Sequence, residues 1–327
     1  MISLAIGLLL LAGLTTLIVQ QSSARDELEK SSRQIENGRY AMQILHDEIE
    51  HGGFYGQYFN IPAPAGVMPD PCATDLVSLD AAMSLPIQGY DAPATVVAPL
   101  SACLNNANHL AGTDILVIRR VDTSVTTMAD AAAGADGLIY LQTTTASQVM
   151  NTGAAADTTK FPLTYSTSTI TGPADLRAYL VHIYFVSPCS TMANGTTCAS
   201  TDDNGQPIPT LKRLELSATG VATLFTLTPL VEGIENLQLD YGIDNDNDGY
   251  PDSYTTAPAT TAAWSNVMAI RVNLLARNND PTPGYSDTKI YSLGGAGTVG
   301  PFNNPYKRHA YSELVRVVNP SGRRAQQ

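Results

Sequence analysis

The chain has 327 residues, which is long enough to bury a hydrophobic core without metal or disulfide staples. Its 30 acidic and 18 basic residues give a net charge of -12, and this surplus of negative charge opposes binding to the phosphate backbone of nucleic acid. Nucleic acid is therefore excluded as a main partner, while the length alone allows one large domain or two smaller ones.

The first element is a long apolar segment. No charged residue occurs from Met1 to Ala24, and Ile2 to Val19 is almost wholly apolar. At about 1.5 Å per residue, a helix of this length crosses a hydrocarbon layer roughly 30 Å thick, so the segment predicts a membrane helix. A cleaved secretory signal would carry Lys or Arg before its apolar run, and none precedes this one. We therefore expect the start of the chain to be incomplete or already processed.

The same helix is expected to continue as far as Gly52-Gly53, because the first proline of the chain is Pro62. An apolar stripe recurs every seven residues along its charged second half, formed by Leu28, Ile35, Met42 and Ile49, with Leu45 on the same face. An ordinary core helix shows the same pattern. We therefore expect the second half of the helix to pack on a folded domain.

Residues 53–327 are expected to form a β-rich domain with long loops. Pro-, Ala- and Thr-rich stretches separate runs that are typical of strands: Asp114–Ile118, Gly137–Leu141, Tyr179–Val186, Arg213–Leu216, Ile234–Ile243, Val267–Leu275 and Tyr311–Val318. Apolar and polar residues alternate in Asn236–Tyr241 and Ile270–Leu274, which predicts strands with one face in water. The predicted fold class is α+β, with a helix at residues 1–52 packed on the β-rich domain.

The four cysteines fall into two local pairs, Cys72 with Cys103 and Cys189 with Cys198. The second pair closes a short loop rich in Ser, Thr, Asn and Gly, as disulfides commonly do. This pattern predicts two disulfides and an oxidising compartment. Four buried or free thiols in a cytosolic protein remain the alternative.

One loop has the composition of a calcium site. Asp244, Asp246, Asp248 and Asp252 stand at positions 1, 3, 5 and 9 of the run Asp244–Asp252, with glycine at position 6. Carboxylates spaced in this way on a tight turn suit Ca²⁺, and the carbonyl of Tyr250 would supply position 7. Position 12 is Thr255 instead of the bidentate glutamate of an EF-hand, which favours a weak extracellular site. A solvated turn rich in Asp and Asn remains the alternative.

Motifs of catalysis are absent from the sequence. No Gly-x-Ser-x-Gly, His-Glu-x-x-His or Gly-x-x-x-x-Gly-Lys occurs, so no catalytic residue is predicted and the protein is not expected to be an enzyme.

Several segments resemble known pilins. Met1–Gly13 resembles the stretch after the cleavage site of type IV prepilins, and Gln34–Met42 resembles the amphipathic half of the same helix. Resemblance to the PilW family of minor pilins continues in order along the chain, in Gly112–Leu116, Pro229–Gln238, Tyr241–Asp244 and Tyr311–Arg324. The family's cleavage glycine, the aromatic residue after it and the glutamate four residues further would lie upstream of Met1.

The resemblance implies a pilin-like fold and a minor pilin that takes part in priming type IV pilus assembly and in the tip complex. It implies other minor pilins and the major pilin as partners through the N-terminal helix, with a tip adhesin possible. It also implies a bacterial inner-membrane protein, with a periplasmic domain, that passes into the extracellular pilus, together with N-terminal methylation, adhesion and twitching motility. Two alternatives stay open: a related J-type pseudopilin of type II secretion, or a membrane-anchored periplasmic binding protein or enzyme.

Overall fold

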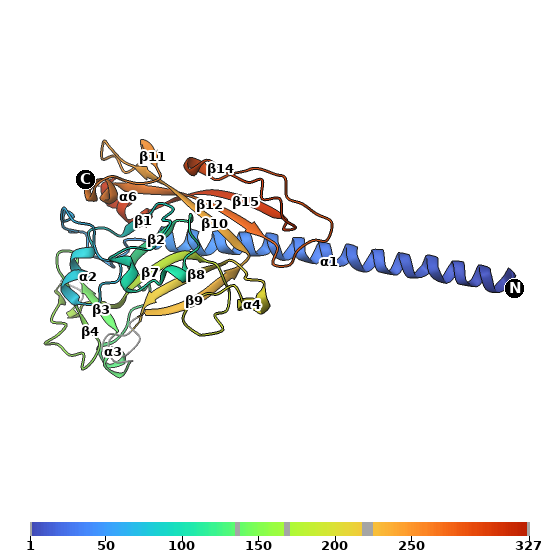
Figure 1. The fold of residues 1–327 in the computed structure, drawn as a ribbon. Coiled ribbons are helices and arrows are strands. Elements are labelled where there is room, and N and C mark those ends of the chain that lie inside the picture. Colours follow the sequence, from blue (N-terminus) through green and yellow to red (C-terminus); the bar gives the residue numbers. More distant parts are fainter. Residues whose placement is uncertain (1, 135–137, 167–170, 218–224, 326–327) are drawn as a thin grey trace.

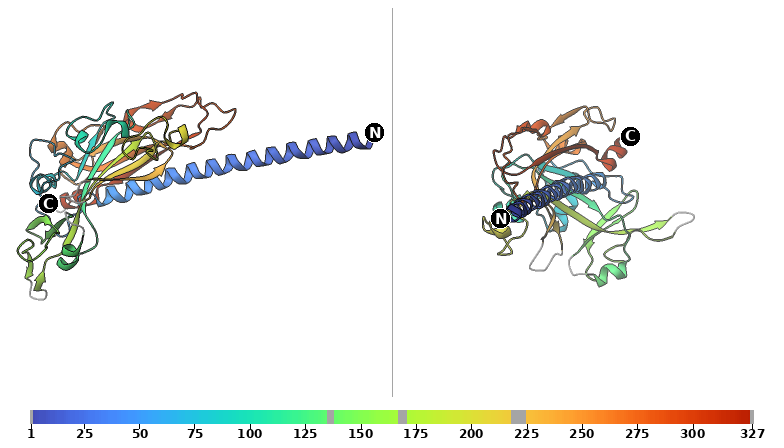
Figure 2. Two further views of the ribbon diagram at one scale, coloured as in Figure 1. Left: turned by 60° about the horizontal axis from the view of Figure 1, so that its bottom comes forward. Right: turned by 90° about the vertical axis from the view of Figure 1, so that its right-hand side faces the viewer.

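A single long helix and a β-rich domain make up the protein. The computed structural model describes residues 2–134, 138–166, 171–217 and 225–325. Helix α1, Ile2–His51, has 50 residues, and its second half lies along the domain while its first half projects away from it (Figures 1 and 2). The helix ends next to Gly53, whose positive φ of 72° suits the left-handed position after a helix. The predicted α+β class is confirmed.

The remaining elements are short helices and strands. The helices are α2 (Leu76–Ala82), α3 (Met128–Ala133), α4 (Asp202–Gly205), α5 (Thr261–Ser265) and α6 (Val318–Arg324), with 3-10 helices η1 (Leu100–Ala102), η2 (Asn106–Asn108) and η3 (Gly294–Ala296). The strands are β1 (Ile87–Tyr90), β2 (Ile115–Val121), β3 (Ile139–Thr143), β4 (Gln148–Thr152), β5 (Thr164–Ser166), β6 (Thr171–Pro173), β7 (Leu176–Ser187), β8 (Thr210–Leu216), β9 (Phe225–Glu232), β10 (Ile234–Ile243), β11 (Ser253–Thr255), β12 (Val267–Arg277), β13 (Tyr291–Ser292), β14 (Thr298–Val299) and β15 (Arg308–Arg316).

Two large antiparallel sheets form most of the domain, and β5 with β6 and β13 with β14 form two-stranded sheets beside them. The larger has seven strands in the order β1-β2-β7-β3-β4, with β8 paired to another stretch of β7 and β9 paired to β8. The smaller has four strands in the order β11-β10-β12-β15. Each predicted strand run corresponds to a strand of these two sheets, although Gly137, the first residue of one run, lies outside the described residues.

The main hydrophobic core lies where α1 meets both sheets. It joins Leu45 and Ile49 of α1 to residues of the larger sheet such as Ile118 and to residues of the smaller sheet such as Ile270. A second core covers the opposite face of the larger sheet, under the segment that carries α2 and Cys72. The long loops after α1 therefore serve as a lid over that face.

The predicted water-facing sides of β10 and β12 are buried instead. Gln238, Asp240 and Asn273 are all almost completely covered. Residues between β12 and β15 fold back over Asp240 and Asn273, and the backbone N–H of Gly295 donates to Asp240 at 2.9 Å. Gln238 donates to the carbonyl of Gly112 at 2.9 Å. Asn273 donates to the same carboxylate at 3.3 Å and accepts from Ser312 at 2.7 Å. Polar residues alternate here because a hydrogen-bonded layer covers them, since buried polar groups need partners.

The predicted stripe on α1 is correct only near its end. Met42, Leu45 and Ile49 are buried, but Leu28 is 71% exposed and Ile35 is 37% exposed. A straight α-helix turns away from a seven-residue repeat by about 20° per heptad, so a face that is buried at one end drifts into solvent further along.

In this part of α1, the face that contacts the domain carries a polar and a small residue, Gln34 and Gly38, instead of Leu28 and Ile35. The Gln34 amide donates to the carbonyls of Ala276 and Lys307 at 2.8 and 2.9 Å. Gly38 has no room for a side chain, because the ring of Tyr311 lies against it. The helix therefore approaches β12 and β15 closely at this point. Hydrophobic periodicity predicts neither the Gln34 hydrogen bonds nor the contact between Gly38 and Tyr311.

A buried ionic cluster fastens the last turns of α1 to the larger sheet. His182 of β7 lies 2.8 Å from Glu48 of α1 and 3.7 Å from Glu215 of β8. Arg120 pairs with Glu48 at 2.8 Å, and Arg213 pairs with Glu215 at 2.7 Å. Burial lowers the pKa of His182, but the two carboxylates outweigh burial and the net effect raises the pKa above its ordinary value.

This cluster predicts a pH-dependent stability. Because the pKa of His182 is higher in the folded protein than in the unfolded chain, its stabilisation is complete below the unfolded pKa and is lost as the pH rises through the folded pKa. We expect His182→Gln to lower the free energy of unfolding more at about pH 6 than at about pH 9, because the contribution of the charged imidazole decreases as the pH rises. Urea unfolding of both proteins at the two pH values measures this, and an equal gap at both would contradict it.

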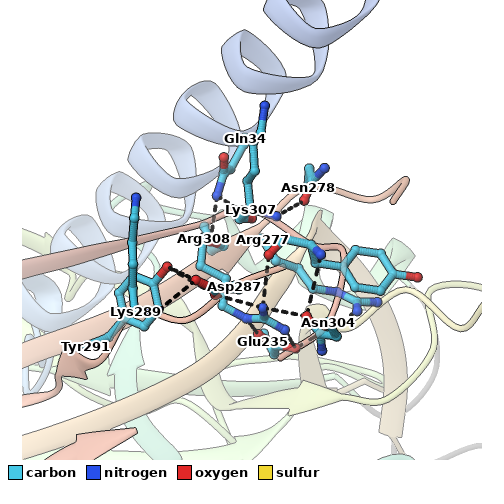
Figure 3. A network of polar contacts seen from close by, with 12 residues as sticks. Gln34, Glu235, Arg277, Asn278, Asp287, Lys289, Tyr291, Asn304, Lys307 and Arg308 are labelled. Carbon is cyan, nitrogen blue, oxygen red and sulfur yellow. Dashed lines mark hydrogen bonds and ion pairs between the residues drawn. The ribbon is translucent and has the colours of Figure 1, made fainter. Parts of the chain in front are cut away.

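A second buried network ties the segment between β12 and β15 to the sheet (Figure 3). The Arg308 guanidinium pairs with Glu235 at 2.5 and 2.9 Å and with Asp287 at 2.9 Å. The Tyr291 hydroxyl donates to Asp287 at 3.0 Å, and the Phe302 ring lies 3.8 Å from the Arg308 guanidinium. This segment also reaches α1, where Lys307 pairs with Glu27 at 2.6 Å. The network fixes the layer that covers β10 and β12.

Candidate functional site

The first half of α1 exposes apolar side chains on all its sides. Leu14 is 58% exposed, Leu17 63% and Ile18 64%, and neighbouring apolar residues are similar. Figure 2 shows this part of the helix clear of the domain. Burying a single leucine or isoleucine stabilises by about 1.5–3 kcal/mol, so a helix that is apolar all round requires a partner. The arrangement is suited to packing against other helices or lipid.

Within the residues that the structure describes, no helix is both long enough and apolar enough to cross a membrane. Met1 lies outside these residues, as do the side chains of residues 2–5, 8 and 9, which belong to the predicted membrane helix.

The predicted calcium loop connects β10 to β11, where β10 ends in the core. Asp244 is fully buried at the end of β10, while Asp246 and Asp252 are exposed. Ligand oxygens of these three carboxylates lie within 4.8 Å of one another. Positions 1, 3 and 9 of the predicted loop therefore come together, and oxygen donors of this type are what Ca²⁺ prefers.

Asp248 is not part of this group. Asp248 accepts the backbone N–H of Tyr250 at 2.7 Å, as in a simple Asx turn. The Tyr250 ring is exposed and lies 4.8 Å from the guanidinium of Arg316. Thr255 belongs to β11 and pairs with Tyr241 in the sheet, so it is part of a strand. The loop thus gathers three of the four predicted carboxylates.

The three gathered carboxylates already have partners. Asp244 accepts the backbone N–H groups of Asn247 and Gly249 at 2.6 and 3.0 Å. Arg324 of α6 also lies 3.8 Å from Asp244. These contacts hold the turn in shape and offset part of its negative charge, while the exposed carboxylates of Asp246 and Asp252 still face each other across the loop. The residues of this loop therefore fit a cation site of low affinity better than one of high affinity.

Sequence reasoning gave no indication of Arg324. It lies 80 residues from Asp244 along the chain, and only the docking of α6 beside the loop brings the two together. The two predicted disulfide pairs are the pairs found in the structure, Cys72 with Cys103 and Cys189 with Cys198.

A long helix with an apolar exposed half, docked by its other half onto an antiparallel β domain, defines a pilin-like α+β protein. The model of the PilW family, type IV pilus-assembly protein W, matches residues 189–319. This match confirms the family resemblance and supports a role in type IV pilus assembly. No curated protein and no solved structure matches the chain. The matched residues run from the Cys189 disulfide to the start of α6, and they include the Asp244 loop and the Arg308 network.

Proposed function

We propose that this protein is a minor pilin, a non-catalytic subunit that helps to prime type IV pilus assembly and lies in the tip complex. The observation that carries the proposal is the exposed apolar half of α1, joined without interruption to a half that is docked on the domain. Such a helix presents a continuous apolar surface to neighbouring helices at a fixed angle to its own domain. Other minor pilins and the major pilin are the proposed partners, with a tip adhesin as a further one.

Before assembly, the apolar half of α1 would lie in the bacterial inner membrane and the domain in the periplasm. After assembly, the same half would lie among the helices of the filament. A type II secretion pseudopilin would use its helix in the same way, but the family match is to a pilus-assembly protein. For a simple membrane-anchored enzyme or binding protein, the helix would have no protein neighbours, and this is a testable difference.

Site-specific cross-linking tests the proposal. A photoreactive phenylalanine analogue placed at Leu14 should link this protein to pilin subunits in sheared filaments, because Leu14 has no contact with its own domain and is 58% exposed. The same analogue at Val77 is a matched control, since Val77 of α2 is 81% exposed on the domain. Leu14 adducts to lipid alone, in cells with normal pili, would contradict the proposal and favour a simple anchor.

We also propose that the Asp244 loop binds Ca²⁺ at extracellular concentrations through Asp244, Asp246 and Asp252. The support is the approach of their oxygens to within 4.8 Å, which a cation would stabilise. Bound calcium would fix the turn that follows β10.

Thermal unfolding checks the calcium site. With millimolar calcium and a dissociation constant of about 10⁻⁴ M, binding should stabilise the folded protein by on the order of 1 kcal/mol relative to chelator, with magnesium less effective. Asp246→Asn should remove this shift, and Asp26→Asn, an exposed carboxylate on α1, should leave it intact. Identical melting curves in calcium and chelator, with no ion detected by calorimetry, would leave only a polar turn.

A further inference from the structure

A cavity opens at the end of the domain that carries α6. Its volume is about 590 Å³, within the range of about 300–1,000 Å³ that is usual for ligand pockets. Figure 1 shows α6 and the C-terminus at the end of the domain opposite the N-terminus of α1. The walls come from the loop after α1, the start of β12, and α6 itself. We call this feature the Arg323 cavity.

Part of the wall of the Arg323 cavity is apolar. Pro62, Pro64, Met268 and Pro320 line it, and Phe59 stands at its border with 55% of its side chain exposed. Proline and methionine side chains form surfaces on which apolar side chains pack without competing hydrogen bonds. Together with Phe59, these residues place an apolar surface beside the arginines of the cavity.

One guanidinium in this cavity lacks a counter-charge. Arg323 donates to the carbonyl of Gly53 at 3.1 Å, and no carboxylate of the described residues pairs with it. Burial lowers the pKa of Arg323, because the charged form loses water without gaining an anion; nearby Tyr55 opposes the shift only in part. A guanidinium has five N–H donors in a planar fork, so it retains donors for a carboxylate after this one bond.

The second arginine of the cavity is already engaged. Arg324 donates to Asn247 and Asn266 and lies 3.8 Å from Asp244. Asp244 therefore offsets the charge of Arg324, and both terminal nitrogens of its guanidinium donate a hydrogen bond. Among the described residues of the cavity wall, the arginine without a counter-charge is therefore Arg323.

We propose that the Arg323 cavity binds an acidic peptide segment of a partner protein, with the carboxylate on Arg323 and flanking apolar side chains on the walls. A planar carboxylate matches one guanidinium, whereas a phosphate dianion would require further free cations. The choice of a protein partner rests on the proposed function, because a filament subunit contacts others at both ends. Residues of α6 line the cavity, and α6 lies at the end of the domain opposite the projecting half of α1 (Figure 1).

Calorimetric titration of the full chain in detergent tests the site. The probe is acetyl-Pro-Leu-Asp-Leu-Pro-amide, and its partner is the same peptide with Asn in place of Asp. We expect the Asp peptide to bind about tenfold more tightly than the Asn peptide, since hydrogen bonds to charged groups contribute about 1.5–3 kcal/mol. Equal binding of the two peptides by the unaltered protein would overturn the proposal, and this comparison changes nothing in the fold.

Two variants locate the binding. Arg323→Gln should lower the affinity for the Asp peptide about tenfold and leave the affinity for the Asn peptide unchanged. Arg39→Gln is the control: it removes the same charge from an exposed position of α1 and should change neither affinity. Arg323→Lys should retain part of the preference for Asp, because the charge remains.

A free sugar acid, glucuronate, separates the two sources of a carboxylate. Binding of glucuronate as tight as that of the peptide would overturn the assignment to a protein segment. Peptide binding that persists when Leu14 gives no pilin cross-links would reject the pilus role and keep the site, so the two failures are distinguishable.

Discussion

Replacing Arg308 by Ala should lower the free energy of unfolding by about 3–5 kcal/mol, because the change removes the guanidinium that pairs with both Asp287 and Glu235. The side chains of Arg308 and Asp287 are both 0% exposed and lie 2.9 Å apart, and Glu235 pairs with the same guanidinium. Burial raises the pKa of Asp287, but hydrogen bonds from Arg308 and Tyr291 more than compensate and hold the pKa below its ordinary value. Without Arg308, the carboxylates of Asp287 and Glu235 would lose a charged partner. In the folded protein they would then have to be protonated or hydrated.

Guanidinium chloride unfolding, followed by circular dichroism, measures this loss. Arg39→Ala is the matched control: Arg39 is exposed, and its loss should change stability by no more than about 0.5 kcal/mol. A loss below about 1 kcal/mol for Arg308→Ala would mean that the network in Figure 3 contributes little. The segment between β12 and β15 would then be held by its apolar contacts alone.

Local sequence patterns were enough to predict the main strands. Ile234–Ile243 was predicted as a run and is β10 with the same bounds, and Val267–Leu275 is β12 extended by two residues. These strands are rich in β-branched and aliphatic residues, so propensity and burial agree. Strand β9 was not predicted, because Pro229 interrupts its pattern. The strand tolerates this proline because β9 lies at the edge of the sheet and Pro229 stands beside a bulge.

Contacts between distant segments were beyond the reach of such patterns. The alternation in Asn236–Tyr241 has the period of a half-wet strand, yet Asp240 is buried beneath a segment about 50 residues further along the chain, and Gln238 is buried beside the carbonyl of Gly112. Periodicity reports which residues share a face and cannot report what covers that face. The same limit applies to Arg323 and Arg324, whose places beside Gly53 and Asp244 depend on how α6 docks.

The Asp244 loop lies between these two cases. Its spacing predicts which carboxylates share a turn, and three of the four do come together. The fourth, Asp248, turns to its own backbone because an Asx turn competes for the same oxygen. Local sequence therefore predicts which carboxylates share the turn, but not which of them approach one another.

The central claim is that the first half of α1 assembles with other subunits instead of serving only as an anchor. Exchanging residues 1–24 for an unrelated membrane span of equal length should keep the protein in the membrane, because apolarity alone suffices for that. The domain should unfold at an unchanged temperature, since the apolar residues of this segment are exposed and the docking contacts begin near Glu27.

Incorporation of the exchanged protein into filaments distinguishes an assembly helix from a simple tether. Sheared pili from cells that carry the exchanged helix should contain none of this protein, and the number of pili per cell should fall, because packing between pilin helices depends on the shape of their apolar surfaces. Normal piliation, with the exchanged protein present in sheared pili at the level of the unaltered protein, would contradict the account and leave the helix as a tether.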